Sequence, residues 1–283
     1  MKILLAITAL CAFAMGNILA EDTITVRGSA VVAMPLTLAS DAIKEALGIE
    51  FKVVTEGGSS DAIYRMAGGY IDVALSTHYM AAGERAEHPD KTFHELLIGR
   101  QVLAVVVSDM VWRSGVHALS KDEIRRIYEH EITNWKQLGG EDRELTYFNR
   151  EVARGVWDLF MIFLYGDARK APNSKAEVLV SSDDVRTVLE FNAGAISIID
   201  LPEVKGESLH ALGIKMADGT VINPTPENIA SGRYELNRPM LAITGKQRTG
   251  KLRKLFDFLV GEKGQACVKK AGGVTLAEMK PGK

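Results

Sequence analysis

The chain has 283 residues, of which 47% are hydrophobic and 25% are charged, a composition typical of a globular protein. Its formal net charge of −2 provides no basic field, so no nucleic-acid partner is expected. Beyond the N-terminus, no apolar run reaches the length of about 18 residues that a transmembrane helix needs.

Residues 1–20 differ in character from the rest of the chain. Lys2 is their only charged residue, Ile3–Met15 is almost continuously apolar, and Ala20 stands just before polar sequence. This order is typical of a cleavable secretory signal peptide, and the apolar run is short for a retained membrane anchor. We therefore expect residues 1–20 to be removed during export.

The first part of the mature chain alternates strand-like and helix-like segments. In order, a strand is expected at 24–26, a helix at 35–47, a strand at 51–54, a helix after the turn at 57–60, and a strand at 71–75. This alternation predicts a parallel sheet with helices on its faces. In such sheets, ligands bind in the loops beyond the carboxyl ends of the strands.

Two hydroxyl-rich loops flank the second of these helices. Gly57–Ser60 precedes the helix, and Ser76-Thr77-His78 follows the strand after it. A helix N-terminus offers unbonded backbone N–H groups and the positive end of the helix dipole, which together favour an anion. The alternative is that these residues serve only as caps and turns.

The second half of the chain continues in the same way. Strands are expected at 102–107, 145–148, 178–180, 194–199 and 240–243, and helices from 121 and at 156–165, 183–191, 252–259 and 261–270. The loop 149–155 joins a strand to a helix and contains Arg150 and Arg154. Guanidinium groups at a helix start would bind an anion with paired hydrogen bonds, although a surface salt-bridge loop is the alternative.

Two other patterns do not predict a site. The loop 77–95 contains His78, His88 and His94, but their spacing fits no compact set of metal ligands. The segment 245–251 resembles the start of a nucleotide-binding loop, yet Leu252 stands where a serine or threonine is required. We therefore expect neither a metal nor a cofactor.

Several short motifs occur in an order that resembles one known family. They are Gly28-Ser29, Gly58-Ser59-Ser60, Ile71–Ser76, Leu119–Ile124, Ile132–Trp135, Gly194-Ala195-Ile196, Pro224–Ile229, Gly232-Arg233-Tyr234, Asn237-Arg238-Pro239, Gly264-Gln265 and a C-terminal Gly-Gly-Val. On these motifs the chain resembles the periplasmic phosphate-binding proteins of ABC importers. The resemblance runs along most of the mature chain.

The resemblance implies an α/β fold of two lobes, a Venus-flytrap with a hinge and an interlobe cleft. Lobe one is expected to comprise 23–104 and 242–283, and lobe two 105–241, with hinge strands at 102–107 and 240–243. It also implies a monomer in the periplasm that delivers phosphate or a related anion to an ABC permease in the inner membrane. The absence of a convincing lipid-attachment cysteine agrees with a periplasmic location.

The resemblance also suggests the ligand-binding residues. They are Ser29, Ala30, Ser59, Ser60, Ser76, Thr77, Arg150, Arg154 and Gly155. Three positions depart from the family pattern, because Thr77-His78 replaces a charged partner, Arg154 replaces a serine and Val156 replaces a threonine. A further threonine of the first loop is replaced by Ala30 or Val31.

These departures leave three functions open. The first is binding of phosphate or a related oxyanion for import, and the second is the same fold with a different anion. The third is a sensor or protein-interaction role without ligand binding. An enzyme such as a phosphatase is not expected, because Ser76 and His78 lie two residues apart on one loop and form no recognisable nucleophile–base arrangement.

Overall fold

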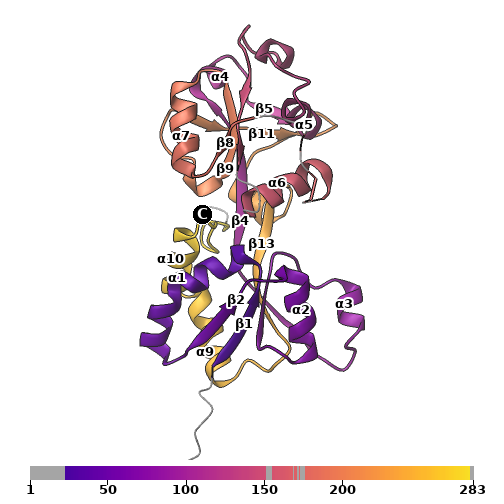
Figure 1. Cartoon of the computed structure of the whole chain (residues 1–283), viewed down its shortest axis with the longest axis vertical. Coiled ribbons are helices and arrows are strands. Elements are labelled where there is room, and N and C mark those ends of the chain that lie inside the picture. Colours follow the sequence, from indigo (N-terminus) through magenta and orange to yellow (C-terminus); the bar gives the residue numbers. More distant parts are fainter. Residues whose placement is uncertain (1–22, 151–154, 168, 171, 173–175, 281–283) are drawn as a thin grey trace, which may run out of the picture.

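The computed structural model describes residues 23–150, 155–167, 169, 170, 172 and 176–280. Two lobes lie one above the other, and strands β4 and β13 run between them (Figure 1). In the described residues, no helix combines the length and hydrophobicity needed to span a membrane.

The lower lobe in Figure 1 contains the first elements of the chain and the last two helices. Its elements are β1 (Ile24–Gly28), α1 (Ala30–Leu47), β2 (Phe51–Val54), α2 (Gly58–Gly68), β3 (Val73–Ser76), α3 (Ala82–Ala86), α9 (Gly250–Val260) and α10 (Glu262–Lys270). Strands β2, β1 and β3 are neighbours and run parallel. The carboxyl ends of these strands, and the loops that follow them, therefore gather at one edge of the sheet.

The upper lobe contains most of the middle of the chain (Figure 1). Its elements are α4 (Asp109–Arg113), β5 (Ala118–Ser120), α5 (Lys121–Tyr128), η1 (Trp135–Leu138), β6 (Thr146–Tyr147), β7 (Asn149–Arg150), α6 (Gly155–Tyr165), β8 (Val178–Leu179), α7 (Ser182–Phe191), β9 (Ala195–Asp200), η2 (Leu201–Glu203), β10 (Leu209–Ala211), β11 (Gly213–Lys215), β12 (Val221–Ile222) and α8 (Pro226–Ala230). In Figure 1, α6 lies on the side of this lobe that is nearer to the lower lobe.

The two lobes share one sheet of strand order β2-β1-β3-β13-β4-β9-β6, with β10 also paired to β4. Strand β4 (His94–Ser108) pairs with β13 (Asn237–Thr244) along its first part and with β9 along its last part. The partner of β4 changes between Val102 and Leu103, where the chain passes from one lobe to the other.

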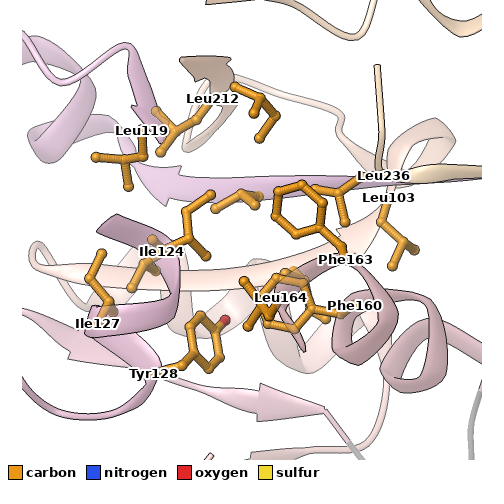
Figure 2. Packing of buried hydrophobic residues seen from close by; sticks show 14 of the residues in the cluster. Leu103, Leu119, Ile124, Ile127, Tyr128, Phe160, Phe163, Leu164, Leu212 and Leu236 are labelled. Carbon is orange, nitrogen blue, oxygen red and sulfur yellow. The ribbon is translucent and has the colours of Figure 1, made fainter. Parts of the chain in front are cut away.

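Each lobe has its own hydrophobic core. In the lower lobe, α1, α9 and α10 pack on the sheet through residues such as Leu36, Ile43 and Phe256. In the upper lobe, the aromatic and aliphatic side chains of α6 pack against α5 (Figure 2). The rings of Tyr128 and Phe160 meet edge to face with centroids 4.8 Å apart, so α6 is anchored firmly in this core.

The first helix is longer than the sequence suggests. The apolar pattern predicts a start at about Pro35, but α1 begins at Ala30 and contains Pro35. The buried face continues back to Val32 and Ala33, and its burial offsets the hydrogen bond that the proline removes. As a result, Ser29 occupies the N-cap position directly after β1.

Other boundaries differ more modestly. The strand expected at 102–107 extends back to His94, because its first half, in which polar and apolar residues are mixed, pairs with β13 over eight positions. The helix predicted from 121 is confirmed, and its capping box is present. The backbone N–H of Glu123 donates to the Ser120 hydroxyl at 3.2 Å, and that of Ser120 donates to the Glu123 carboxylate at 2.7 Å.

Gly28 permits the close approach of β1 to β3. Its φ is +145°, and a Cβ atom there would overlap the backbone carbonyl of Leu75. We expect Gly28→Ala to reduce the free energy of unfolding by about 1–3 kcal/mol more than Gly48→Ala, because overpacking adds to backbone strain. Gly48 also has a positive φ, of +61°, but no neighbour within 4 Å of the added methyl group, so it is a control without the overlap. Equal losses in urea unfolding would show that the overlap is relieved.

Candidate functional site

The two hydroxyl-rich loops of the lower lobe meet in the structure. Ser59 lies in the first turn of α2, and Thr77 follows the end of β3. The backbone N–H of Thr77 donates to Ser59 Oγ at 3.2 Å, and the two hydroxyl oxygens are 3.4 Å apart. Two side chains 18 residues apart in sequence are therefore held as one hydroxyl pair.

Two helix N-termini lie next to the ends of β1 and β2. Ser29 at the N-cap of α1 donates its backbone N–H to the carbonyl of Leu75 at 2.9 Å, and its side chain makes no capping bond. Ala30 and Ser60 are exposed in the first turns of α1 and α2. Both helices are longer than ten residues, so each presents a positive dipole end at this edge of the sheet.

A charge cluster that the sequence analysis missed lies beside α2. The carboxylate of Asp61 accepts hydrogen bonds from Arg27 Nε at 2.8 Å and from Arg65 Nε at 2.9 Å. The bond from Arg65 is the main reason that the pKa of Asp61 falls below its usual value. Two guanidinium groups therefore accompany one carboxylate, and the cluster has an excess positive charge near the N-terminus of α2.

Ser76 has a different environment from its neighbours. It is fully buried, its hydroxyl donates to the carbonyl of His78 at 2.6 Å, and it accepts the backbone N–H of His78 at 3.1 Å. Its oxygen therefore closes the turn that presents Thr77. The imidazole of His78 lies 3.7 Å from the carboxylate of Glu84, and the hydroxyl of Ser76 is bonded to main-chain atoms.

Of the three predicted residues of the upper lobe, the structure describes Arg150 and Gly155. Arg150 at the end of β7 is 4% exposed, and its guanidinium donates to the carbonyl of Ser181 at 2.8 Å. Gly155 is the first residue of α6. Arg154 lies outside the described residues.

A chain of polar side chains crosses the strands between the lobes, and none of its members was expected to be functional. Arg238 Nε on β13 donates to Gln101 Oε1 on β4 at 3.0 Å. Gln101 Nε2 in turn donates to Asp200 Oδ1 at the end of β9 at 3.3 Å. The sequence did contain a signal, because Asp200 is the polar residue that directly follows the buried run Ala195–Ile199.

Burial changes the ionisation of both ends of this chain. It raises the pKa of Asp200 to about 6, against the opposing effects of Gln101, Arg150 and Arg238. It also lowers the pKa of Arg238, which is partly restored by the negative charges of Asp158 and Asp200. A charged side chain is therefore less favourable at this crossing than in water, and the pKa of Asp200 is about 6.

No group of three or more His, Cys, Asp and Glu side chains that could bind a metal occurs among the described residues. What gathers at the edge of the lower lobe is a set of hydrogen-bond donors with positive potential. Such a set is chemically suited to an oxyanion.

Comparison with known proteins identifies the family. A sequence model of the PBP superfamily domain matches residues 19–263. The chain belongs to the PBP superfamily. The family resemblance and the two-lobe α/β fold expected from the sequence are both confirmed.

Several named proteins are similar to this chain in sequence or in structure. The phosphate-binding protein PstS of Bacillus subtilis is 26% identical over 269 residues, which cover 94% of this chain and 85% of the relative. An ABC-type phosphate transport receptor from Vibrio cholerae is 25% identical, with a TM-score of 0.67 over 89% of this chain and 99% of the receptor. A possible phosphate-binding protein from Planctomyces limnophilus shares the fold, with 20% identity and a TM-score of 0.77 over 90% of this chain and 93% of that one.

The raised pKa of Asp200 predicts a pH-dependent stability. In the folded protein the carboxyl retains its proton up to about pH 6, whereas an unfolded aspartate has a pKa near 3.8. The resulting stabilisation is complete below about pH 4 and is lost as the pH rises through 6. Asp200→Asn cannot ionise, so we expect its free energy of unfolding, relative to wild type, to be higher at pH 7 than at pH 4 by about 3 kcal/mol at most.

Chemical unfolding of both proteins between pH 4 and pH 8 measures this difference. A difference that stays constant over the whole range would mean that Asp200 has an ordinary pKa.

Proposed function

We propose that this protein is an extracytoplasmic solute-binding protein that captures phosphate or a related oxyanion for an ABC importer. The observation that carries the proposal is the Ser59–Thr77 hydroxyl pair, placed beside the N-termini of α1 and α2 and the Arg27–Asp61–Arg65 cluster. An oxyanion accepts hydrogen bonds, and this edge offers hydroxyl and backbone donors in a positive potential. The similarity to the phosphate-binding protein of Bacillus subtilis and to the phosphate transport receptor of Vibrio cholerae supports the same ligand.

Within this proposal the two lobes contribute different groups. Lobe one, taken as 23–104 with 242–283, supplies the backbone N–H groups after Ser29 and Ala30 and the hydroxyls of Ser59, Ser60 and Thr77. Ser76 holds the turn that presents Thr77.

Lobe two, taken as 105–241, supplies the charge of Arg150 and Arg154 and the start of α6 at Gly155. The ligand then contacts both lobes and stabilises their closed arrangement about β4 and β13.

The location and partner follow from the same proposal. Cleavage of residues 1–20 would release the protein into the periplasm as a monomer, where it would deliver its ligand to a permease of the inner membrane. The similarity to the ABC-type phosphate transport receptor of Vibrio cholerae supports a carrier rather than a catalyst.

A hydrolytic role has little chemical support. A serine nucleophile needs a base within hydrogen-bond reach of its hydroxyl. The hydroxyl of Ser76 is instead bonded to the main chain of His78, and the imidazole lies beside Glu84. We therefore infer a binding protein without turnover.

The proposal predicts stabilisation by an anion. The mature chain, stripped of bound ligand, should gain about 2.7 kcal/mol from phosphate at about 100 times its dissociation constant. For a protein of this size, that corresponds to a rise of roughly 5–10 °C in the melting temperature. A thermal-shift series with phosphate, phosphonates, sulfate and small carboxylates measures it.

The outcomes separate the candidate functions. Stabilisation by another anion but not by phosphate would mean that the fold has a different ligand. Absence of stabilisation by every anion would contradict ligand capture and favour a protein-interaction role.

The hydroxyl pair predicts the effect of two substitutions. Ser59→Ala and Thr77→Val each remove one donor to a dehydrated anion, a loss of about 1–2 kcal/mol, which weakens binding about 5- to 30-fold. Isothermal titration calorimetry with the anion that stabilises the wild type measures the loss. Ser231→Ala is the matched control, because Ser231 is an exposed residue at the end of α8 in the other lobe. Unchanged affinity in both variants would show that the hydroxyl pair does not bind the anion.

A further inference from the structure

A short segment after α10 connects the two lobes in addition to β4 and β13. This segment, residues 271–280, which we call the C-terminal strap, lies between the lobes (Figure 1). Val274 of the strap forms an antiparallel bridge with Arg100 of β4. The N–H of Arg100 donates to the carbonyl of Val274 at 3.0 Å, and the N–H of Val274 donates to the carbonyl of Arg100 at 2.8 Å.

This bridge lies close to the residue at which β4 changes lobe. The register partner of Arg100 on β13 is Pro239, which has no N–H to donate. Both backbone groups of Arg100 are instead bonded to the strap. The strap therefore occupies the edge of β4 that β9 covers from Leu103 onward.

Hydrogen bonds attach the strap to the lower lobe through Gln265 of α10. Gln265 Nε2 donates to the carbonyl of Ile98 on β4 at 2.8 Å, and Gln265 Oε1 accepts the N–H of Leu276 in the strap at 2.8 Å. The carboxylate of Glu278 also accepts a bond from Lys269 of α10 at 2.7 Å. The motifs Gly264-Gln265 and Gly-Gly-Val, which the proposed function does not use, thus meet in this attachment.

The same strap places apolar side chains in the core of the upper lobe. Val268 on α10 is buried in the core of the lower lobe, whereas Val274 and Met279 belong to the buried cluster that contains α5 and α6. Val274 is 5% exposed and Met279 is 7% exposed. Glu278 fixes the turn between them, because its carboxylate accepts the N–H of Thr275 at 2.9 Å and the Thr275 hydroxyl at 2.8 Å. The strap is therefore attached to both lobes.

The attachments to the two lobes differ in kind. The lower lobe holds the strap by directional hydrogen bonds and by its direct connection to α10, whereas Met279 is held in the upper lobe by burial of apolar atoms. A methionine side chain is flexible and adapts to different apolar surroundings, whereas a hydrogen bond is lost when its geometry changes. Of the attachments, the burial of Met279 is thus the one that can be released without disrupting α10.

Rotation of one lobe against the other moves α10 relative to the upper-lobe core, and the strap joins the two. We propose that the C-terminal strap restrains this rotation, and that rotation requires Met279 to leave the upper-lobe core while Gln265 keeps the strap on α10. Loss of the burial raises the free energy of every rotated arrangement, so the strap keeps those arrangements sparsely populated. The inference concerns the motion of the lobes and does not depend on which ligand the cleft binds.

Interlobe distances measured without ligand test the restraint. Nitroxide labels at the exposed positions Asp41→Cys of α1 and Glu227→Cys of α8, in Cys267→Ser protein, report the separation of the lobes by pulsed electron paramagnetic resonance. Met279→Ala should give a broader distance distribution than the protein with Met279. Met66→Ala is the matched control, because Met66 is 3% exposed and lies in the core of the lower lobe alone.

The control separates the restraint from general destabilisation. Both substitutions remove the same buried atoms and should lower the stability of the protein, but only Met279→Ala should broaden the distribution. Equal distributions with Met279 and with Met279→Ala would overturn the role of the strap. Equal broadening in Met279→Ala and Met66→Ala would overturn it as well.

A measurement on the wild-type protein avoids any effect of substitution on folding. In protein labelled at the methionine methyl groups, relaxation dispersion detects exchange between environments on the microsecond to millisecond timescale of lobe rotation. The methyl group of Met279 should show such exchange, and that of Met66 should not. Exchange at Met279 no greater than at Met66 would show that Met279 stays in the upper-lobe core, which contradicts the proposal.

Discussion

Strand β4 is a single backbone that hydrogen-bonds in the sheets of both lobes, and the rest of the structure depends on this crossing. Backbone hydrogen bonds to the neighbouring strands fix β4 on either side of the crossing. Any rotation of one lobe against the other must therefore change the backbone dihedral angles of the few residues around Val102. Hydrogen bonds also fix these residues. Leu103 donates its N–H to the carbonyl of Leu236 at 2.8 Å, and its carbonyl accepts the hydroxyl of buried Tyr234 at 2.9 Å. These bonds hold the backbone of β4 in place at the crossing.

Charged side chains at the crossing lose free energy of hydration. Stability alone therefore does not explain why they are there. Burial lowers the pKa of Arg238 and raises that of Asp200, so each charge would be more favourable in water. Arg238 and Asp200 are half-buried charges joined through Gln101, and apolar residues of similar volume often stabilise such positions as well or better. Gln101, hydrogen-bonded to both, keeps the two charges from being isolated. A function linked to charge gives a physical reason for such an arrangement in a hinge.

The local elements and the family could be read from the sequence, whereas the relations between distant segments could not. Capping residues such as Ser120 act within one turn, so their effect is visible in a short stretch. The predicted start of α1 was wrong, because the helix continues back to Val32 and Ala33, whose burial depends on tertiary packing. The Ser59–Thr77 bond and the partners of Asp200 depend on how strands pair, and nothing in a single chain segment encodes such a pairing.

The two lobes differ in the kind of interaction that they can offer an anion. Along the lower lobe, the groups nearest the strand ends are hydroxyls and backbone N–H groups, and Asp61 neutralises part of the charge of Arg27 and Arg65. Arg150 and Arg238, in contrast, belong to the upper lobe and to the crossing. If the anion needs both kinds of group, its affinity for the closed arrangement exceeds its affinity for either lobe alone. The anion can shift the lobes toward the closed arrangement only by this difference in affinity. The unequal distribution of donors and charge between the lobes would therefore allow the bound anion to stabilise closure.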